Sequence, residues 1–417
     1  MNTLRVIDYL IAILFTLCYA YQFLYIPIPW FVKKRSSEKP LVYHDFAVLI
    51  CARNEAAVIG DLLDSLRHQT YPAEKLHLFV MADNCTDATA AIAESRGAKV
   101  YTRFDKTNIG KGYALQVLMD CLKRDYPAGF DGYFVFDADN LLEPDYIEQM
   151  NKTFSEGNEI ITSYRNSKNY GDNWISAGYA LWFLRESKYL NLPRYLLGTS
   201  CAVSGTGFLF SKSVAREIGS WPVHLLTEDI EFSIHQITRG RKIAFCKDAV
   251  LYDEQPTSFR QSWRQRMRWS KGFLQVFHSY GIRLIQGLFR GSFSCFDMTM
   301  TIMPAFFLSV ASIICNITLG IWGASIGDDV MIAVRSIGGM LLHMYLILFI
   351  AGAITTVTEW KKIQTTPVKK ILYLFTFPLF MFTYVPISFA ALFFKTSWKP
   401  ITHCVTAKKA GLKMQMH

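Results

Sequence analysis

The chain has 417 residues, of which 51% are hydrophobic and 15% aromatic, and its formal net charge is +10. This composition argues against an ordinary soluble domain, because the apolar residues gather in four segments, each able to cross about 30 Å of hydrocarbon as a helix. Much of the positive charge lies beside these segments, where lysine and arginine set topology, and no recognised nucleic-acid-binding pattern is present. We therefore expect a multi-pass protein of the cell membrane without a nucleic-acid partner.

The first apolar segment, residues 9–32, is too long for a cleaved signal peptide and has no small-residue cleavage site. The basic residues that follow it are Lys33, Lys34, Arg35 and Lys39. The positive-inside rule places them, and the long insert behind them, in the cytoplasm. The remaining apolar segments are residues 298–327, 336–358 and 371–394.

Strand-like and helix-like segments alternate along the insert. Continuous apolar runs predict buried strands over residues 46–51, 77–81, 98–101 and 133–136. Helical periodicity predicts helices over residues 58–66, 85–97 and 111–124. This alternation predicts a mostly parallel α/β sheet. In such sheets the residues after strand ends gather in the ligand crevice, which selects Glu55, Asp83 and the pair Asp137 and Asp139.

Asp137 and Asp139 lie two residues apart, directly after the strand predicted at 133–136. Carboxylate oxygens in this position suit Mg²⁺ or Mn²⁺, with substrate phosphates completing the coordination shell. The alternative is a structural role, in which Asp139 or Asn140 caps a helix that begins near Pro144.

Three further features suit a nucleotide. Asp83 ends a strand, where acidic residues accept hydrogen bonds from a base or ribose. Lys111 and its neighbouring glycines begin a helix, where main-chain N–H groups and an ammonium group suit a diphosphate. The turn of Ser204, Gly205 and Thr206 allows a close approach of the backbone to a ligand. Ordinary glycine-containing loops are the alternative for the last two.

An acidic pair and a basic, aromatic helix complete the candidate site. Glu228 and Asp229 lie in the first turn of a helix that Thr227 can cap, so the helix dipole alone could explain them. Gln265, Arg268 and Trp269 share one face of a later helix. That helix has the charge and the aromatic stripe of one that lies on a membrane surface, which is the alternative explanation.

Taken in chain order, these motifs resemble the pattern of the membrane-embedded, processive family-2 glycosyltransferases. The motifs are Asp83, Asp137-Ala-Asp139, Thr227-Glu-Asp229 and Gln265-Arg-Met-Arg-Trp269. The family comprises the synthases of cellulose, chitin, hyaluronan and related β-glycans, and the resemblance covers residues 46–272. It implies a GT-A-type catalytic domain inserted between transmembrane helices. The expected domains are a helix at 1–32, a cytoplasmic catalytic domain at 33–258, interface helices at 259–297, transmembrane helices at 298–394 and a basic tail at 395–417.

The resemblance also implies a role for each motif. Asp83 would bind the uridine, even though Ala82 stands where many relatives have a first aspartate. Asp139 would coordinate the metal, with Asp137 beside it at the ribose and diphosphate. Asp229 would be the general base that deprotonates the acceptor hydroxyl, and Glu228 would help to position that site.

The remaining residues would bind the donor and the acceptor. Arg268 and Trp269 would face the diphosphate and the acceptor sugar, with Gln265 on the same side. Lys111, Glu55 and the Ser204, Gly205 and Thr206 turn would complete the substrate-binding set.

The implied function is a processive, inverting transferase that polymerises a hexose from a UDP-sugar and secretes the product through its own helices. UDP-glucose and a β-glucan are the favoured donor and product. An N-acetylglucosamine polymer and non-processive transfer to a lipid are the alternatives. The implied cofactor is Mg²⁺ or Mn²⁺, and the partners are the donor, the growing polysaccharide and membrane lipids. A second copy or an accessory subunit could complete the channel, because one span precedes the catalytic domain.

The topology after the insert contains a conflict. Three spans behind a cytoplasmic insert would place the C-terminus outside, yet lysines follow the last apolar segment and favour the inside. That segment contains Pro378 and Pro386, so we expect it to be broken or re-entrant.

Overall fold

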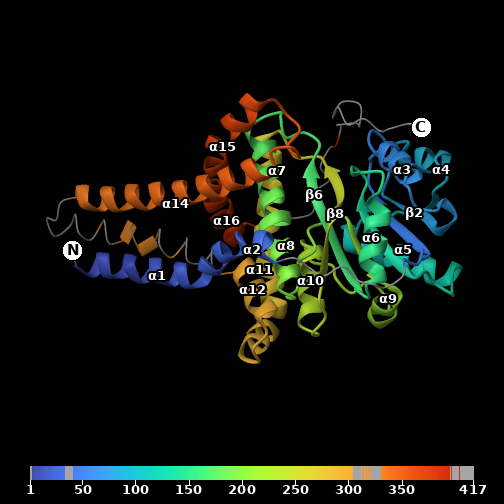
Figure 1. Cartoon of the computed structure of the whole chain (residues 1–417), viewed down its shortest axis with the longest axis horizontal. Coiled ribbons are helices and arrows are strands. Elements are labelled where there is room, and N and C mark those ends of the chain that lie inside the picture. Colours follow the sequence, from blue (N-terminus) through green and yellow to red (C-terminus); the bar gives the residue numbers. More distant parts are fainter. Residues whose placement is uncertain are drawn as a thin grey trace.

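The computed structural model describes residues 2–32, 41–303 and 330–394, together with isolated positions between 311 and 321 and at 396 and 403. An eight-stranded sheet with the order β3-β2-β1-β4-β7-β6-β8-β5 forms its core (Figure 1). The strands are β1 (Phe46–Ala52), β2 (Leu76–Asp83), β3 (Lys99–Arg103), β4 (Gly132–Asp137), β5 (Leu141–Leu142), β6 (Ile160–Ser167), β7 (Phe208–Ser211) and β8 (Ala244–Asp253). The four strands predicted from apolar runs are all present, each within two residues of its predicted bounds.

The first half of the sheet is parallel, as predicted. Strand β1 pairs with β2 and with β4, and β2 pairs with β3, all in parallel. The second half is mixed, because β7 runs antiparallel to β4 and β6, β5 runs antiparallel to β8, and β6 and β8 are parallel. The α/β class is confirmed, and the antiparallel strands are an addition that the sequence did not predict.

Helices cover both faces of the sheet. They are α3 (Ile59–Arg67), α4 (Thr89–Ser95), α5 (Lys111–Asp125), α6 (Tyr146–Ser155), α7 (Trp174–Glu186), α8 (Leu192–Leu196), α9 (Lys212–Ile218) and α10 (Glu228–Ile237). Apolar residues of α3 and α6 pack in one buried cluster, and those of α5 and α7 pack in another. The helix predicted over 85–97 is shorter in the structure, because the Asp87 carboxylate accepts the Thr89 N–H at 3.0 Å and starts α4 there.

The helices at the two ends of the chain and after the sheet are α1 (Asn2–Tyr25), α2 (Ile28–Phe31), α11 (Phe259–Phe289), α12 (Phe293–Ile302), α14 (Val330–Thr358), α15 (Pro367–Phe382) and α16 (Tyr384–Phe393). Helices α1 and α14 project in the same direction, away from the sheet (Figure 1). Among the described residues, two segments are long and apolar enough to cross a membrane, Leu341–Thr358 and Pro367–Phe393. Most of the span predicted at 298–327 lies outside the described residues.

The last apolar segment is interrupted at Thr383, where α15 ends and α16 begins, and Pro378 lies inside α15. Thr383 keeps helical dihedral angles, with φ −64° and ψ −14°, so the interruption is local and a re-entrant course stays a prediction. Arg266 of α11 is fully buried at this point, where its Nη1 donates to Phe380 O at 3.1 Å and to Thr383 Oγ1 at 2.6 Å. Its guanidinium also lies 4.8 Å from the centre of the Tyr384 ring. Helix α11 therefore supplies hydrogen bonds where α15 and α16 meet.

A second buried arginine ties the N-terminal helix to the catalytic domain. Arg194 of α8 donates to both oxygens of Asp297 in α12, at 2.7 and 2.8 Å. Tyr21 and Tyr25 of α1 donate to the same carboxylate, at 2.8 and 2.9 Å. Because Asp297 is fully buried, this one carboxylate fixes three helices against each other.

Candidate active site

One cavity of about 1380 Å³ receives the polar residues from the carboxyl ends of β1, β2, β4 and β8. Every residue of the predicted site except Thr206 lines it. These residues are Glu55, Asp83, Lys111, Asp137, Asp139, Ser204, Gly205, Glu228, Asp229, Gln265, Arg268 and Trp269. The residues that follow the predicted strand ends therefore lie around one cavity, and residues of α10 and α11 join them there.

Asp137 and Asp139 have different environments although they are two residues apart. Lys111 Nζ lies 2.5 Å from Asp137 Oδ1 and donates to Gly205 O at 2.8 Å. Burial lowers the pKa of Lys111, but the charges of Asp137 and Glu228 outweigh this effect and raise it. Asp139 is buried, and its Oδ2 accepts the backbone N–H of Glu254 at 2.9 Å. Lys111 therefore stays charged beside the strand end.

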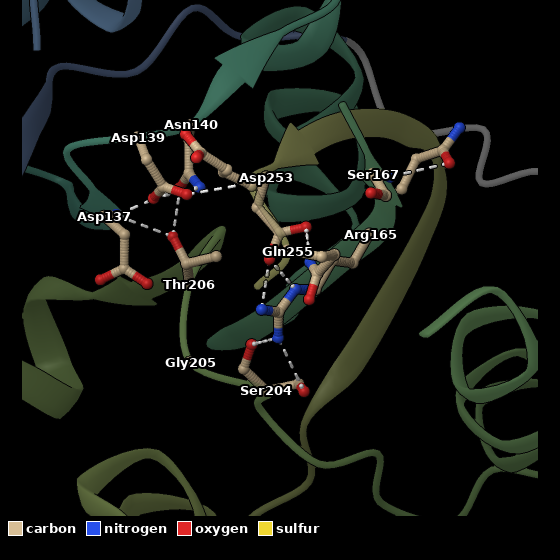
Figure 2. Close-up of polar contacts among 12 residues, drawn as sticks. Asp137, Asp139, Asn140, Arg165, Ser167, Ser204, Gly205, Thr206, Asp253 and Gln255 are labelled. Carbon is tan, nitrogen blue, oxygen red and sulfur yellow. Dashed lines mark hydrogen bonds and ion pairs between the residues drawn. The ribbon is translucent and has the colours of Figure 1, made fainter. Parts of the chain in front are cut away.

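Thr206 does not line the cavity but holds the end of β4 in place through hydrogen bonds. Its Oγ1 accepts the backbone N–H of Asp137 at 2.9 Å and donates to Asn140 Oδ1 (Figure 2). Asn140 also accepts the Asp137 N–H, at 3.1 Å. The short strand β5 follows directly, so neither Asp139 nor Asn140 caps a helix, and the capping alternative is wrong. Helix α6 begins only at Tyr146.

Gly205 forms an open surface between the two acidic pairs. Its φ of +77° favours glycine. A Cβ added there would lie 3.9 Å from Asp137 Oδ2 and 3.9 Å from Asp229 Oδ2. Both carboxylates therefore face the same small space above the turn, which is where the reacting groups of two substrates could meet.

Asp83 is held by a buried arginine. Arg103 Nη1 lies 2.6 Å from Asp83 Oδ1, and the same guanidinium pairs with Asp105. Asn84 Nδ2 also donates to Asp83 Oδ1, at 3.0 Å. One oxygen of Asp83 is thereby fixed by protein donors, which orients the carboxylate at the edge of the cavity.

Glu55 contacts a residue that sequence reasoning missed. His403 Nδ1 lies 3.0 and 3.1 Å from the two carboxylate oxygens of Glu55. Burial lowers the pKa of His403, but the charges of Asp139 and Glu55 overcome it and raise the pKa to about 10. The two residues are 348 positions apart, so no local pattern could have joined them.

Glu228 and Asp229 form a partly buried acidic pair at the start of α10. Burial and the charge of Asp229 raise the pKa of Glu228 to about 7, although Lys111 and Arg268 oppose the shift. Burial also raises the pKa of Asp229. Thr227 takes the N-cap position as predicted, but its side chain makes no capping hydrogen bond. Backbone N–H groups at the start of α10 act to lower the pKa values of both carboxyl groups, but burial in the cavity outweighs them.

Helix α11 brings the Gln-x-x-Arg-Trp element against this pair. A Cβ on Gly272 would lie 2.5 Å from Thr227 Oγ1, so the two helices touch there. Arg268 Nη1 donates to Leu226 O at 2.6 Å, and the Trp269 ring packs edge-on against Tyr179 with 5.7 Å between centroids.

The predicted apolar stripe of α11 packs inside the protein. Val276 is fully buried, and Phe273 and Tyr280 are partly buried in a cluster with residues of α10 and α12. That face therefore does not lie on a membrane surface, and the surface-helix alternative is wrong for the stripe.

Three polar residues that the sequence did not select complete the site. Arg165 at the end of β6 pairs with Asp253 at the end of β8 and donates to Ser204 O at 2.9 Å (Figure 2). Its guanidinium lies 3.6 Å from the centre of the Phe183 ring. Ser204 Oγ donates to Glu186 Oε2 at 3.2 Å. Strands β6 and β8 end in polar residues, as β2 and β4 do. This pattern could have selected Arg165 and Asp253 only if the two strands had been predicted.

The donor set at the end of β4 fits a hard divalent cation. No group of three or more histidine, cysteine or acidic side chains converges on one point in the part of the chain that the structure describes. The protein would contribute the carboxylates of Asp137 and Asp139, with diphosphate oxygens as further ligands. This division is the usual one for Mg²⁺ beside a nucleotide.

The sheet, the acidic strand ends and the acidic pair on α10 define a GT-A-type sugar transferase. Residues 44–272, which make up more than half of the chain, match the model of the family described as glycosyltransferase like family 2. The protein belongs to this family.

Similarity to individual proteins is lower. Over 254 residues the chain is 26% identical to the probable glycosyltransferase YdaM of Bacillus subtilis (strain 168), with 54% of each chain covered. It is 24% identical over 244 residues to the β-monoglucosyldiacylglycerol synthase of Synechocystis sp. (strain ATCC 27184 / PCC 6803 / Kazusa), covering 57% of this chain and 50% of the relative. It is 25% identical over 237 residues to the poly-β-1,6-N-acetyl-D-glucosamine synthase of Staphylococcus aureus (strain COL), covering 55% and 54%. The chain thus spans about half the length of these relatives.

A solved structure shares the fold over nearly the whole chain. The mannosyltransferase PcManGT from Pyrobaculum calidifontis, solved in complex with GDP-Man and Mn²⁺, superposes with a TM-score of 0.56 and 14% identity. The superposition covers 92% of this chain and 98% of that one. At this identity the likeness concerns the fold alone.

Proposed function

We propose that this glycosyltransferase transfers one hexose from a UDP-sugar to a hydroxyl group of a membrane lipid, with inversion to a β-linkage. The observation that carries the proposal is the continuity of the cavity, which runs from Asp229 to apolar side chains of α1, α12, α14 and α15. The similarity to a β-monoglucosyldiacylglycerol synthase supports it. The catalytic domain would lie at the cytoplasmic face of a membrane that the helices cross.

The membrane side of the cavity suits an alkyl chain better than a sugar chain. Most of the side chains there are aliphatic, methionine or phenylalanine, among them Phe23, Met300, Ile302, Met303, Leu341, Met344, Ile347, Leu348, Ile354, Phe377 and Met381. The polar side chains between them include Tyr9, Thr16, Tyr19, Gln22, Thr301, His343, Thr355, Tyr384 and Ser388. A polysaccharide channel would need polar partners for the hydroxyl groups of each sugar, because buried polar groups without hydrogen bonds are unfavourable. The excess of apolar side chains therefore favours a lipid as the acceptor.

The donor would bind along the acidic strand ends. Asp83, oriented by Arg103, would accept hydrogen bonds from the uridine. Lys111 starts α5, so its ammonium group and the helix N-terminus would face the diphosphate. A divalent cation held by Asp137 and Asp139 would neutralise charge that develops on the leaving diphosphate.

Asp229 would accept the proton of the lipid hydroxyl as that oxygen attacks C1 of the sugar and the bond from C1 to the diphosphate breaks. A general base works best when its pKa approaches the working pH, and burial raises the pKa of Asp229 in that direction. Glu228, with a pKa raised to about 7, would be partly protonated at neutral pH and would limit the negative charge beside the base. Single displacement on an α-linked donor gives the β-product.

A processive β-glycan synthase is the second candidate. Trp269 favours it, because its ring packs beside Tyr179 and Phe183 at the wall of the cavity, where an aromatic face could hold an acceptor sugar. The similarity to a poly-β-1,6-N-acetyl-D-glucosamine synthase also supports a polymer. In that case UDP-glucose and a β-glucan, or an N-acetylglucosamine polymer, would be the donor and product.

The test incubates the purified full chain with radiolabelled UDP-glucose or UDP-N-acetylglucosamine, Mg²⁺ or Mn²⁺, and lipid vesicles. We expect the label in a chloroform-soluble product whose mass exceeds that of the acceptor lipid by one hexose, and no product with Asp229→Asn. Label in an ethanol-insoluble product that linkage-specific hydrolases release would establish the polymer instead. Absence of UDP release with every donor would contradict both candidates.

A further inference from the structure

Arg185, one residue before the end of α7, lies on the wall of the cavity and forms no ion pair with any described acidic side chain. Its Nη2 donates to Gln22 Oε1 of α1 at 3.1 Å, and its guanidinium lies 5.2 Å from the Trp182 ring. Within the described residues it makes no other hydrogen bond and no ion pair. A guanidinium group carries five N–H donors, so four of them have no protein acceptor there.

Other arginines that line the cavity lie close to carboxylates. Arg165 and Arg194 each pair with an aspartate, and the charge of Arg268 acts to lower the pKa values of Glu228 and Asp229. Burial, together with the positive charge of Arg194, lowers the pKa of Arg185 to about 10, although the charge of Glu186 opposes the shift. The side chain is half-buried on the wall of the cavity and forms no ion pair with a described residue. A negative group that entered the cavity would therefore find free N–H donors at this position.

The position of Arg185 along the cavity identifies that group. On one side its neighbour Glu186 accepts a hydrogen bond from Ser204, beside the Gly205 turn that faces Asp229. On the other side Gln22 and the apolar walls of α1 and α14 lead away from the catalytic end. An anion bound at Arg185 would thus lie between the acceptor hydroxyl and the alkyl chains of a lipid.

We propose that Arg185, assisted by Gln22, binds the phosphate group of an anionic glycerophospholipid whose headgroup carries the acceptor hydroxyl. The inference rests on the proposed transfer to a lipid and specifies its substrate class. The planar fork of a guanidinium group matches two oxygens of a phosphodiester. The amide of Gln22 accepts from Arg185 and fixes the guanidinium for this contact. In the reaction the bond from sugar C1 to the diphosphate breaks, the bond from C1 to the headgroup oxygen forms, Asp229 takes the proton, and the phosphodiester stays intact.

A lipid phosphate that acts as the nucleophile itself fits the site less well. Its attacking oxygen would have to lie at Asp229, and the negative charges of the phosphate and of this carboxylate would repel each other. A neutral glycerolipid would leave Arg185 without a bound counter-charge. A lipid whose headgroup hydroxyl lies at Asp229 and whose phosphate lies at Arg185 would give the base its proton donor and the guanidinium its counter-charge.

The experiment measures transfer by the full chain in detergent-stabilised form to two kinds of vesicle, phosphatidylglycerol and phosphatidylcholine that contains diacylglycerol. Glycerophosphoglycerol in solution and polyprenyl phosphate vesicles serve as further acceptors. The variants are Arg185→Gln, Arg185→Lys and, as a charge-matched control, Arg124→Gln, whose side chain is 71% exposed on α5. Thermal unfolding and UDP binding show whether each variant is folded.

We expect the wild type to prefer phosphatidylglycerol. Arg185→Gln should lower kcat/KM for it by about 10- to 100-fold, the range for a charge-assisted hydrogen bond, and should leave transfer to diacylglycerol and UDP binding unchanged. Arg185→Lys should recover part of the loss, and Arg124→Gln should match the wild type.

Four outcomes would overturn the inference. Equal use of both vesicles, or equal loss on both with Arg185→Gln, would remove the anionic subsite but leave lipid transfer standing. Equal transfer to soluble glycerophosphoglycerol would show that the alkyl chains are not recognised. An acid-labile product from polyprenyl phosphate would make the phosphate the nucleophile. A sugar polymer in place of any glycolipid would refute the proposed function, and the subsite with it.

Discussion

Replacement of Asp229 by asparagine separates its proposed role as base from every structural role it could have. Asparagine keeps the shape of the side chain and can still accept the backbone N–H at the start of α10, but it cannot take up a proton. General-base catalysis contributes roughly 10²- to 10⁴-fold, which is about 2.7 to 5.4 kcal/mol of activation free energy. We expect a loss near the upper end, because burial raises the pKa of Asp229 toward the working pH and its Oδ2 lies beside the open position at Gly205.

The assay follows UDP release under saturating donor and acceptor, while calorimetry measures UDP binding in the presence of Mn²⁺. Turnover should fall by about 10³- to 10⁴-fold. The dissociation constant for UDP should change less than about 3-fold, because the proposed donor contacts lie on β2, α5 and β4. Asp248→Asn, at a 60% exposed side chain on β8, is the matched control and should behave as wild type. A loss of UDP binding equal to the loss of turnover would make Asp229 a nucleotide-binding or structural residue.

Three further predictions test the environment of the site. Glu228→Gln should change how stability depends on pH: the raised pKa of about 7, against the usual 4.5, means that protonated Glu228 stabilises the fold below pH 4.5 and that this contribution is lost as the pH rises through 7. The variant should therefore gain up to about 3 kcal/mol over wild type by pH 8 in unfolding experiments, and parallel curves would contradict the assignment. Arg194→Met should destabilise by about 3 to 5 kcal/mol, because it leaves the buried Asp297 carboxylate without its ion pair; a change below 1 kcal/mol in detergent unfolding would argue against the tie. Gly205→Ala should fold but bind UDP weakly. Gly207→Ala should not fold, because its Cβ would lie 1.9 Å from the buried Leu251 side chain. Equal stability of the two variants would refute this geometry.

The parallel half of the fold was predictable from sequence because its strands are buried on both faces and appear as continuous apolar runs. Asp83 and Asp137 could be selected for the same reason, since each directly follows such a run. Strand β6, with the sequence Ile-Ile-Thr-Ser-Tyr-Arg-Asn-Ser, contains only two consecutive aliphatic residues, so it was not recognised. Arg165, near the end of that strand, was missed because the strand was not recognised.

Other features depend on contacts between distant parts of the chain. The ion pair of His403 with Glu55 joins the C-terminal region to the first strand end, and neither residue carries a local signal for the other. The stripe on α11 has the periodicity of a membrane-surface helix, but α10 and α12 cover it. Periodicity identifies an apolar face, whereas the partner of that face is decided by tertiary packing.

The buried Arg266 has a consequence for how the protein is made. Its guanidinium donates to Phe380 O and to Thr383 Oγ1 at the interruption between α15 and α16, although it lies 114 positions before Phe380 in the chain. In the proposed membrane topology, the last span would therefore pack against a helix that is synthesised before it. Correct placement of the C-terminal helices would then depend on the fold of the domain that precedes them.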